Sequence, residues 1–367
     1  MIILSIAAGR LLSVKFTLEE KIIDGQKVYL WMMFLIFFLV MGLRAPSVGT
    51  DTLLYGQLYR TIGSYNSLLD ALENPQLQSA PAYILISRFL NWFSSDPQIL
   101  SIATGLYISA FLFLFILKTS KDIPLSVFSW IGLALFFSSM NTNRQYMAMV
   151  TLLYGLFCLF EKFKNLKGWL LILLALGLHQ TSFVAIAIVM SGMFLATKVK
   201  DNRLIIIISS AAGIILSFLL PVGINFFNML FPRYARYTVG YSAIFDFLGQ
   251  GRVIILYVFL FSLCLLVLFG KKSDNDDKVD NFCQKIFPAV ICMTIFGIFN
   301  NDIILANRIV SYFIALYICI IPYVLNRYSG VSRIYLRAGI ILALSIYAGI
   351  AMWEGISGST PYRFFWQ

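Results

Sequence analysis

The most regular feature of the sequence is the alternation of long apolar segments with short polar ones. Most apolar segments hold about 15 to 20 residues, close to the length of a helix that crosses the hydrocarbon core of a bilayer. We expect such helices over segments 28–43, 98–117, 123–140, 146–160, 204–220, 253–270, 286–299, 303–325 and 334–352. The pattern predicts an all-α, polytopic integral membrane protein with about 11 to 12 transmembrane helices, some broken or re-entrant, and an outer-face cavity.

Other apolar segments are too short or too interrupted for a regular crossing. Segment 1–14 lacks a basic start and a small-residue cleavage site, so we do not expect a removable signal peptide. The amphipathic segment 80–93 contains Arg88 and is expected to lie on or dip into the outer face. Segments 168–178 and 183–196 predict a broken or re-entrant hairpin. Whether 1–14 and 80–93 cross the membrane stays open.

The polar segments are too short to form a soluble domain, so we expect a single membrane-embedded domain over residues 1–367. Three loops stand out by length. We place 44–97 on the outer face, with an amphipathic helix, and 221–251 on the same face, rich in aromatic residues and arginine. The charged segment 271–285 is expected to be a cytoplasmic loop.

Composition supports the membrane assignment and excludes several functions. The chain is 60% hydrophobic and 12% charged, and its mean hydropathy is +0.84, far outside the soluble range. The net charge of +11 does not indicate nucleic-acid binding, because the basic residues lie in short clusters between apolar segments. The five cysteines lack metal-binding spacing, and no nucleotide-binding loop or G-x-S-x-G elbow is present. We expect no cofactor, no metal and no nucleic-acid partner.

Lysine and arginine are distributed differently. Every lysine lies inside if the cytoplasm holds segments 15–27, 118–122, 161–167, 198–203, 271–285 and 327–337. The outer face then carries Arg44, Arg60, Arg88, Arg144, Arg233, Arg236, Arg252, Arg308 and Arg363. Arginine keeps its charge when buried, and its planar fork of donors matches phosphate groups. The set favours binding of a dianionic headgroup; for a single arginine, the alternatives are snorkelling or pairing with Asp51, Asp246 or Asp302.

Segment 141–148, N-T-N-R-Q-Y-M-A, places an arginine between two apolar segments. An ionisable residue in such a position is usually functional. Asn141 and Asn143 are expected to cap the following helix, and Arg144 in its first turn would form an anion site. The alternative is a capped hairpin whose arginine reaches lipid headgroups.

His179 is the only histidine of the chain. Its unperturbed pKa near neutrality suits a base that deprotonates a hydroxyl, and Thr181 or Ser182 is expected to cap the helix that follows. The alternative is a hydrogen-bonded structural histidine. A metal site is not expected, because one histidine without a nearby carboxylate pair cannot complete a coordination shell.

Three more polar segments have two interpretations each. Asp51 either binds sugar hydroxyls or an arginine, or it caps a helix. The aromatic and arginine residues of 233–241 either stack on sugars or form an interfacial belt. Asp302 either pairs with Arg308, which falls in the first turns of the next span, or binds sugar hydroxyls.

Taken in order, these motifs resemble the EpsG-like family of Wzy-type polysaccharide polymerases. The resemblance covers nearly the whole chain. It rests on Arg44 with V-G-T-D-T-x-x-Y at 48–55, N-R-Q at 143–145 with Ala148, L-H-x-x-S at 178–182, N-R at 307–308 with Tyr312, and P-Y at 361–362. Asn143 stands where the family pattern has a residue such as Ile, a departure that concerns local packing and leaves the arginine in place.

The resemblance implies a multi-pass enzyme of the bacterial plasma membrane whose active site faces the periplasm or the extracellular side. Such a glycosyltransferase passes the growing glycan from undecaprenyl diphosphate to the non-reducing end of another lipid-linked repeat unit, without metal or nucleotide. Its expected partners are the undecaprenyl-diphosphate-linked oligosaccharide, membrane lipids, and a chain-length regulator and flippase of the same pathway. Alternatives are a lipid-linked glycan ligase and, from another class, a transporter, which the absence of paired halves disfavours.

The expected site combines cations with a base. Arg44, Arg144, Arg236 and Arg308 are expected to bind the diphosphate, and Arg144 to stabilise its departure. His179 ranks ahead of Asp51 as the base because of its pKa, although a carboxylate is usual in glycosyl chemistry. Glycan binding is expected from Tyr55, Asn143, Gln145, Tyr237, Tyr241, Asp302 and Tyr362.

Overall fold

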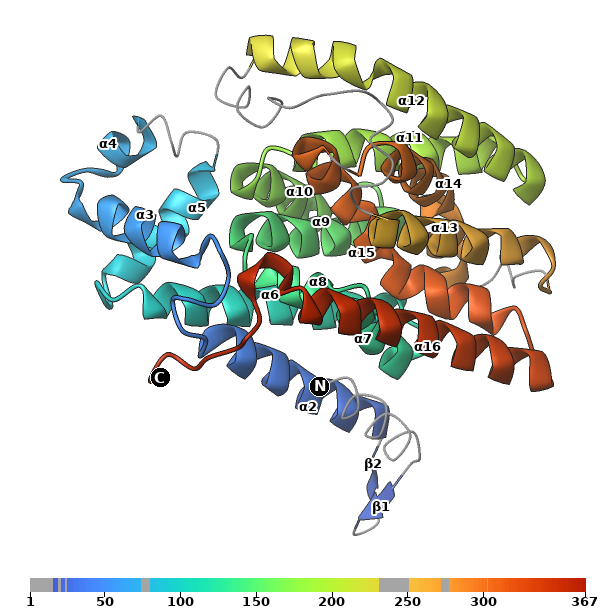
Figure 1. Cartoon of the computed structure of the whole chain (residues 1–367), viewed down its shortest axis with the longest axis horizontal. Coiled ribbons are helices and arrows are strands. Elements are labelled where there is room, and N and C mark those ends of the chain that lie inside the picture. The colour runs from blue at the N-terminus through green and yellow to red at the C-terminus, as the bar shows by residue number, and fades with distance from the viewer. Residues whose placement is uncertain are drawn as a thin grey trace. The chain divides into compact units, whose positions relative to one another are not determined.

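The computed structural model describes residues 16–18, 21–23, 25–73, 80–230, 251–271, 277–301 and 303–367. These residues are almost entirely helical (Figure 1). The exception is a short antiparallel hairpin of β1 (Phe16–Leu18) and β2 (Lys21–Ile23). The prediction of an all-α, polytopic membrane protein is confirmed.

Within the described residues, seven helices are long and apolar enough to cross a membrane. They are α2 (Gly25–Gly42), α6 (Gln98–Thr119), α12 (Asn202–Leu230), α13 (Gly251–Leu265), α14 (Lys278–Phe299), α15 (Ile304–Asn326) and α16 (Gly330–Trp353). Three apolar helices are shorter, namely α7 (Ile123–Gly132), α10 (Leu166–Leu178) and α11 (Ser182–Lys198). The shorter helices correspond to parts of the expected apolar segments 123–140, 168–178 and 183–196.

The chain forms two compact units. Unit 1 comprises Met1–Ser182 and Ala338–Gln367, and unit 2 comprises Phe183–Arg337. The elements of unit 1 not yet given are α3 (Thr52–Ser64), α4 (Leu68–Glu73), α5 (Pro81–Asn91), α8 (Leu135–Ser139), α9 (Asn143–Glu161) and η3 (Ile356–Gly358). The remaining element of unit 2 is η2 (Leu266–Leu268).

The centre of unit 1 is the helix α9, whose residues from Gln145 to Leu159 are all buried. Beside it, α2 and α6 approach closely, because a Cβ atom on Gly105 would lie 2.9 Å from the backbone nitrogen of Gly42. The ring of Phe37 fills the adjoining space, with ring centroids 5.3 Å from Phe113 and 4.6 Å from Phe136. Such packing of glycine and aromatic residues is typical of helices that associate in a membrane.

The apolar segment 123–140 was expected to form one span but forms two helices, α7 and α8. Ala134 between them has a φ of +60°, which a regular helix does not allow. At the end of α7, a Cβ atom on Gly132 would lie 2.8 Å from the Cβ of Leu344, so α7 lies directly against α16. The serines of this segment, at 126, 129, 138 and 139, lie away from the break, so no polar residue marks it.

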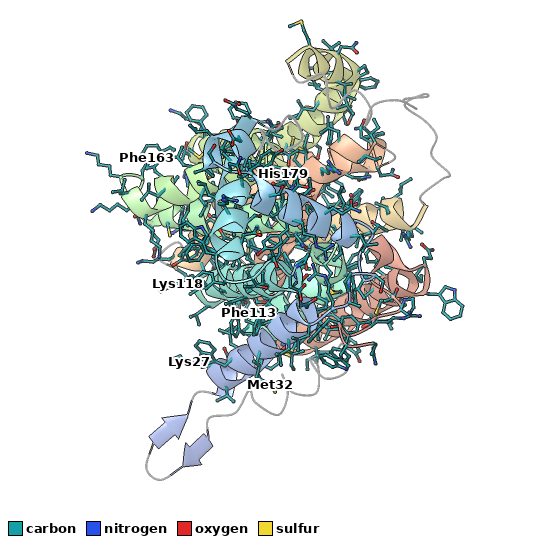
Figure 2. All side chains as sticks on the ribbon, turned by 90° about the vertical axis from the view of Figure 1, so that its left-hand side faces the viewer. Lys27, Met32, Phe113, Lys118, Phe163 and His179 are labelled. Carbon is teal, nitrogen blue, oxygen red and sulfur yellow. The ribbon has the colours of Figure 1, made fainter. Side chains whose placement is uncertain are left out.

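Arginine and lysine lie at opposite ends of the helices in unit 1. Lys27 is in the first turn of α2, and Arg44 follows its end. The side chain of Gln98, at the start of α6, donates to the Gly42 carbonyl at 2.7 Å, so α6 begins where α2 ends. Lys118 in the last turn of α6 therefore lies at the same end as Lys27 (both labelled in Figure 2).

In unit 2, α14 and α15 are central and α12 is peripheral. About four fifths of the apolar stretch is buried in α14 and α15, 78% in each, but only 28% in α12. The loop expected over 221–251 starts later, because α12 continues through Pro221 to Leu230. The loop expected over 271–285 is also shorter, because Asp277 accepts bonds from Val279 N and Asp280 N and caps α14 at Lys278.

Candidate functional site

The C-terminal segment fixes the backbone around Arg44. Arg44 forms an antiparallel bridge with Phe364. The backbone nitrogen of Ala45 donates to Arg363 O at 2.9 Å, and that of Phe365 donates to Leu43 O at 2.9 Å. This short pairing holds the backbone on both sides of Arg44 immediately after α2, and the side chain of Arg44 is fully buried.

The guanidinium of Arg44 is charged but has no carboxylate beside it among the described residues. It donates to the backbone oxygen of Met41 and, at 3.3 Å, to Asn143 Oδ1, whereas its Nε is buried without a hydrogen bond. Burial lowers the pKa of Arg44 to about 10, and the nearby Tyr362 and Tyr83 oppose this shift. Arg44 is therefore still protonated at neutral pH. A buried cation without a counter-ion is costly, which suits a residue that receives an anion.

A turn at Gly49 brings the start of α3 to the start of α9. Gly49 has a φ of +92°, and a Cβ atom there would lie 2.7 Å from Thr52 Oγ1 and 2.8 Å from Met140 O. Asn141 Oδ1 accepts from Asp51 N at 2.7 Å and from Thr50 Oγ1 at 3.0 Å. Because only glycine fits this conformation and space, the V-G-T-D-T motif is in part a structural requirement.

The asparagines before Arg144 do not cap α9 as expected. Thr142 occupies the N-cap position and makes no side-chain capping bond. Asn141 instead holds the turn before α3, and Asn143 accepts the hydrogen bond of Arg44. Both asparagine side chains accept hydrogen bonds from residues that are distant in sequence. A capping rule based on local sequence does not consider such partners.

Arg144 is held by two tyrosines. Its Cζ lies 5.4 Å from the ring centroid of Tyr55, on α3, and 5.4 Å from that of Tyr83, on α5. Both rings are buried, and such cation–π contacts fix the direction of a guanidinium without neutralising it. Burial raises the pKa of Tyr83, while the positive charges of Arg144 and Arg44 oppose that rise. Tyr83 thus lies within electrostatic reach of both arginines.

Asp51 occupies the N-cap position of α3, but its side chain makes no capping bond. Its carboxylate has no hydrogen-bond partner among the described residues, and the residue is half-buried. The interpretation of Asp51 as a helix cap is therefore wrong. The carboxylate stays available for a ligand, on the turn that Asn141 ties to the start of α9.

His179 ends α10 in the turn that leads to α11 (labelled in Figure 2). Its Nδ1 lies 2.7 Å from Thr181 Oγ1, and the Ser182 hydroxyl donates to Ala175 O at 3.2 Å. A Cβ atom on Gly177 would lie 3.0 Å from the Cβ of Ala82 on α5. The end of α10 thus meets the start of α5, where Ala82 immediately precedes Tyr83.

The remaining predicted residues fall into two groups. Arg236, Tyr237, Tyr241 and Asp302 lie outside the described residues. Arg308 belongs to unit 2, in the second turn of α15, and its backbone oxygen accepts from Ser311 Oγ at 2.9 Å. Unit 1 therefore brings together Arg44, Asp51, Tyr55, Asn143 and Arg144, and their role in diphosphate and glycan binding stays a prediction.

Two predicted glycan-binding residues have structural contacts. Gln145 is buried in α9, with 4% of its surface exposed. The Tyr362 hydroxyl donates to Val40 O at 2.8 Å and attaches the C-terminal segment to α2. The contact of Tyr83 with Arg144 was not predicted from the sequence, because an amphipathic segment does not indicate which helix it packs against.

A pocket of about 200 Å³ adjoins these residues in unit 1. Tyr55 and Asn143, which contact Arg144 and Arg44 respectively, form part of its wall. The helices α3 and α6 supply most of the other lining residues.

The described residues form a mainly helical, multi-pass membrane protein in which a buried arginine lies close to a pocket lined by polar and apolar residues. The model of the EpsG family matches residues 27–364, nearly the whole chain. The chain belongs to the EpsG family, which is associated with polysaccharide polymerase-like proteins, so its function lies in polysaccharide biosynthesis. The match includes Arg44, Asp51, Tyr55, Asn143 and Arg144. No curated protein and no solved structure matches the chain.

Proposed function

We propose that the protein is a polysaccharide polymerase that extends a glycan carried on undecaprenyl diphosphate. The observation that carries the proposal is the buried guanidinium of Arg44, which has no carboxylate partner among the described residues. This guanidinium donates to Asn143, and the next residue of the chain is Arg144. Two adjacent cations suit a diphosphate, and their fixed positions stabilise negative charge as it develops.

In the proposed reaction, a hydroxyl at the non-reducing end of one lipid-linked unit attacks the anomeric carbon of another glycan. The bond between that carbon and the diphosphate oxygen breaks, and undecaprenyl diphosphate leaves with the electron pair. The proton of the hydroxyl passes to a base. No nucleotide is needed, because the diphosphate ester is already an activated donor. Arg44 and Arg144 stabilise the leaving group, and Arg236 and Arg308 are proposed to assist.

The contacts favour Asp51 over His179 as the base. The carboxylate of Asp51 makes no hydrogen bond within the described residues, whereas Nδ1 of His179 is already engaged with Thr181. In addition, the backbone nitrogen of Asp51 donates to Asn141, which ties Asp51 to the start of α9, where Arg144 lies. The ranking is therefore the reverse of the one based on pKa alone.

We place the site on the outer face of a bacterial plasma membrane. The proposal is supported by unit 1, where lysines lie at the helix ends opposite to Arg44. By the positive-inside rule, the lysine end faces the cytoplasm.

The test uses the purified full-length protein in detergent with lipid-linked repeat units isolated from the polysaccharide-producing strain. We expect a ladder of products that grow by one repeat unit at a time. A single transfer to another acceptor would identify a ligase instead. Translocation of intact units across liposomes, without chain growth in detergent, would identify a transporter and overturn the proposal.

A further inference from the structure

The pocket in unit 1 has walls from α3, from the start of α6 and from the first residue of α9. From these walls we infer that it binds one pyranose ring of the glycan, next to the reacting bond. The inference rests on the proposed function, which it deepens by assigning a sugar subsite. Pockets for drug-sized ligands measure about 300 to 1,000 Å³. A volume of about 200 Å³ therefore suits a single ring and not an oligosaccharide.

A buried donor faces this space. Asn143 lines the pocket and is only 2% exposed. Its carbonyl oxygen accepts the bond of Arg44, but its amide nitrogen donates to no group among the described residues. This nitrogen is not fully enclosed, so an acceptor in the pocket can reach it. A sugar hydroxyl oxygen in the pocket would satisfy it.

The rim of the pocket carries both signs of charge. Arg60, on α3, makes no hydrogen bond or ion pair with the described residues, and its side chain is exposed. The carboxylate of Asp96, before α6, accepts only from Gln98 N among the described residues, at 2.9 Å and through one of its two oxygens. A guanidinium on α3 and a carboxylate in the turn before α6 can donate to and accept from neighbouring hydroxyls of one ring. An isoprenoid chain would leave these groups and Asn143 unpaired.

The remaining wall is less polar and connects the pocket to the arginines. Pro97 closes one side, since a Cβ atom on Gly56 would lie 3.3 Å from its Cβ. Tyr55 forms part of the wall and also contacts Arg144. A pyranose ring has apolar C–H faces that suit such surfaces. Because Tyr55 leads to Arg144 and Asn143 to Arg44, the ring would lie next to the proposed diphosphate position.

The affinities for two lipids distinguish a failure of this inference from a failure of the proposed function. Undecaprenyl diphosphate without sugar probes the arginines alone, and the purified lipid-linked repeat unit probes the arginines and the pocket. Affinities are measured with full-length protein in detergent. The wild-type protein is expected to bind the glycosylated lipid about tenfold or more tightly than the bare lipid, because several polar contacts are added.

Ser101→Phe tests the pocket directly, because Ser101 lines it and is 8% exposed. We expect this variant to lose the tenfold gain from the sugar and to keep the affinity for the bare lipid. Leu106→Phe is the matched control on the same helix, since Leu106 is 45% exposed and outside the pocket. Asp96→Asn changes an exposed rim residue without effect on packing and should reduce the gain from the sugar severalfold.

The outcomes are distinguishable. If neither lipid binds to the wild-type protein, the proposed function fails. If both lipids bind equally well, or if Ser101→Phe keeps the full gain from the sugar, the sugar subsite is refuted and the polymerase proposal stands. If Ser101→Phe weakens both lipids, the result for Asp96→Asn decides: an unchanged gain from the sugar overturns the inference.

Discussion

The guanidinium of Arg44 donates a hydrogen bond to the side-chain carbonyl of Asn143, 3.3 Å away. This bond joins the end of α2 to the first residue of α9. It also turns the amide of Asn143 so that one residue contacts both an arginine and the pocket. The next residue is Arg144, so both proposed diphosphate ligands depend on the position of one helix start.

Arg44 is predicted to reduce the stability of the empty protein. Replacing it by Met removes a buried charge and retains most of its volume, which should raise stability by about 1 to 3 kcal/mol or leave it unchanged. Chain extension should be abolished, because the proposed leaving group loses a cation. Thermal unfolding in detergent and the product ladder measure the two effects. A strong loss of stability with retained chain growth would contradict both statements.

Arg144→Lys should abolish long-chain glycan although the protein still inserts into the membrane. Lysine keeps the charge but lacks the planar fork that stacks between Tyr55 and Tyr83. We expect a loss of about 10²-fold or more in the rate of extension. Glycan length on gels, in a strain deleted for the gene, is the measurement. Arg88→Lys is the control, because Arg88 bonds only the backbone oxygens of Ile62 and Gly63 among the contacts described.

The two candidate bases give opposite expectations. Asp51→Asn should slow chain extension about 10²- to 10⁴-fold, because an amide cannot accept the proton. His179→Gln should have less than about a tenfold effect, since its contact with Thr181 is a local one. Initial rates with purified lipid-linked units would measure both variants. A larger loss for His179→Gln than for Asp51→Asn would restore histidine as the base.

Gly49→Ala should destabilise unit 1 by about 1 to 3 kcal/mol, because a residue with φ near +90° is strained and the new methyl would collide with Met140 O. Gly349→Ala is the matched substitution, since nothing lies within 4 Å of its added Cβ. The unfolding temperature of each variant in detergent is the readout. Equal temperatures for both variants would show that the turn before α3 adapts freely.

The orientation in the membrane can be tested with single cysteines. The five native cysteines are buried, so their background labelling should be low. Gln57→Cys, on the arginine side, should react with a membrane-impermeant maleimide in intact cells, and Lys164→Cys should react only after lysis. The reverse pattern would place the site in the cytoplasm and contradict the proposed reaction at the outer face.

Regular elements of the fold could be predicted because the thickness of a bilayer sets the length of apolar helices. The expected span 98–117 corresponds to α6, and 303–325 corresponds to α15. The break at Ala134 could not be predicted, since it depends on packing of α7 against Leu344 and not on a local signal.

The positions of some candidate residues could be predicted. The separation of arginine from lysine along the sequence indicates which helix ends carry arginine, and anion binding at those ends stays a prediction from the charge and donor geometry of arginine. The burial of Arg44 was not foreseeable, since it results from an extended pairing with Phe364 that joins two remote segments. Neither were the two tyrosines around Arg144, because α3 and α5 meet only in the folded chain.

The pairing of the C-terminal segment with residues 43–45 has a consequence for biosynthesis. Unit 1 consists of Met1–Ser182 and Ala338–Gln367, so its two parts are separated by all of unit 2. While Phe364 of a nascent chain is still in the ribosomal tunnel, it cannot pair with Arg44. The backbone pairing around Arg44, which we propose to bind an anion, thus forms only after translation has passed Phe364, and an incomplete chain in the membrane would lack it.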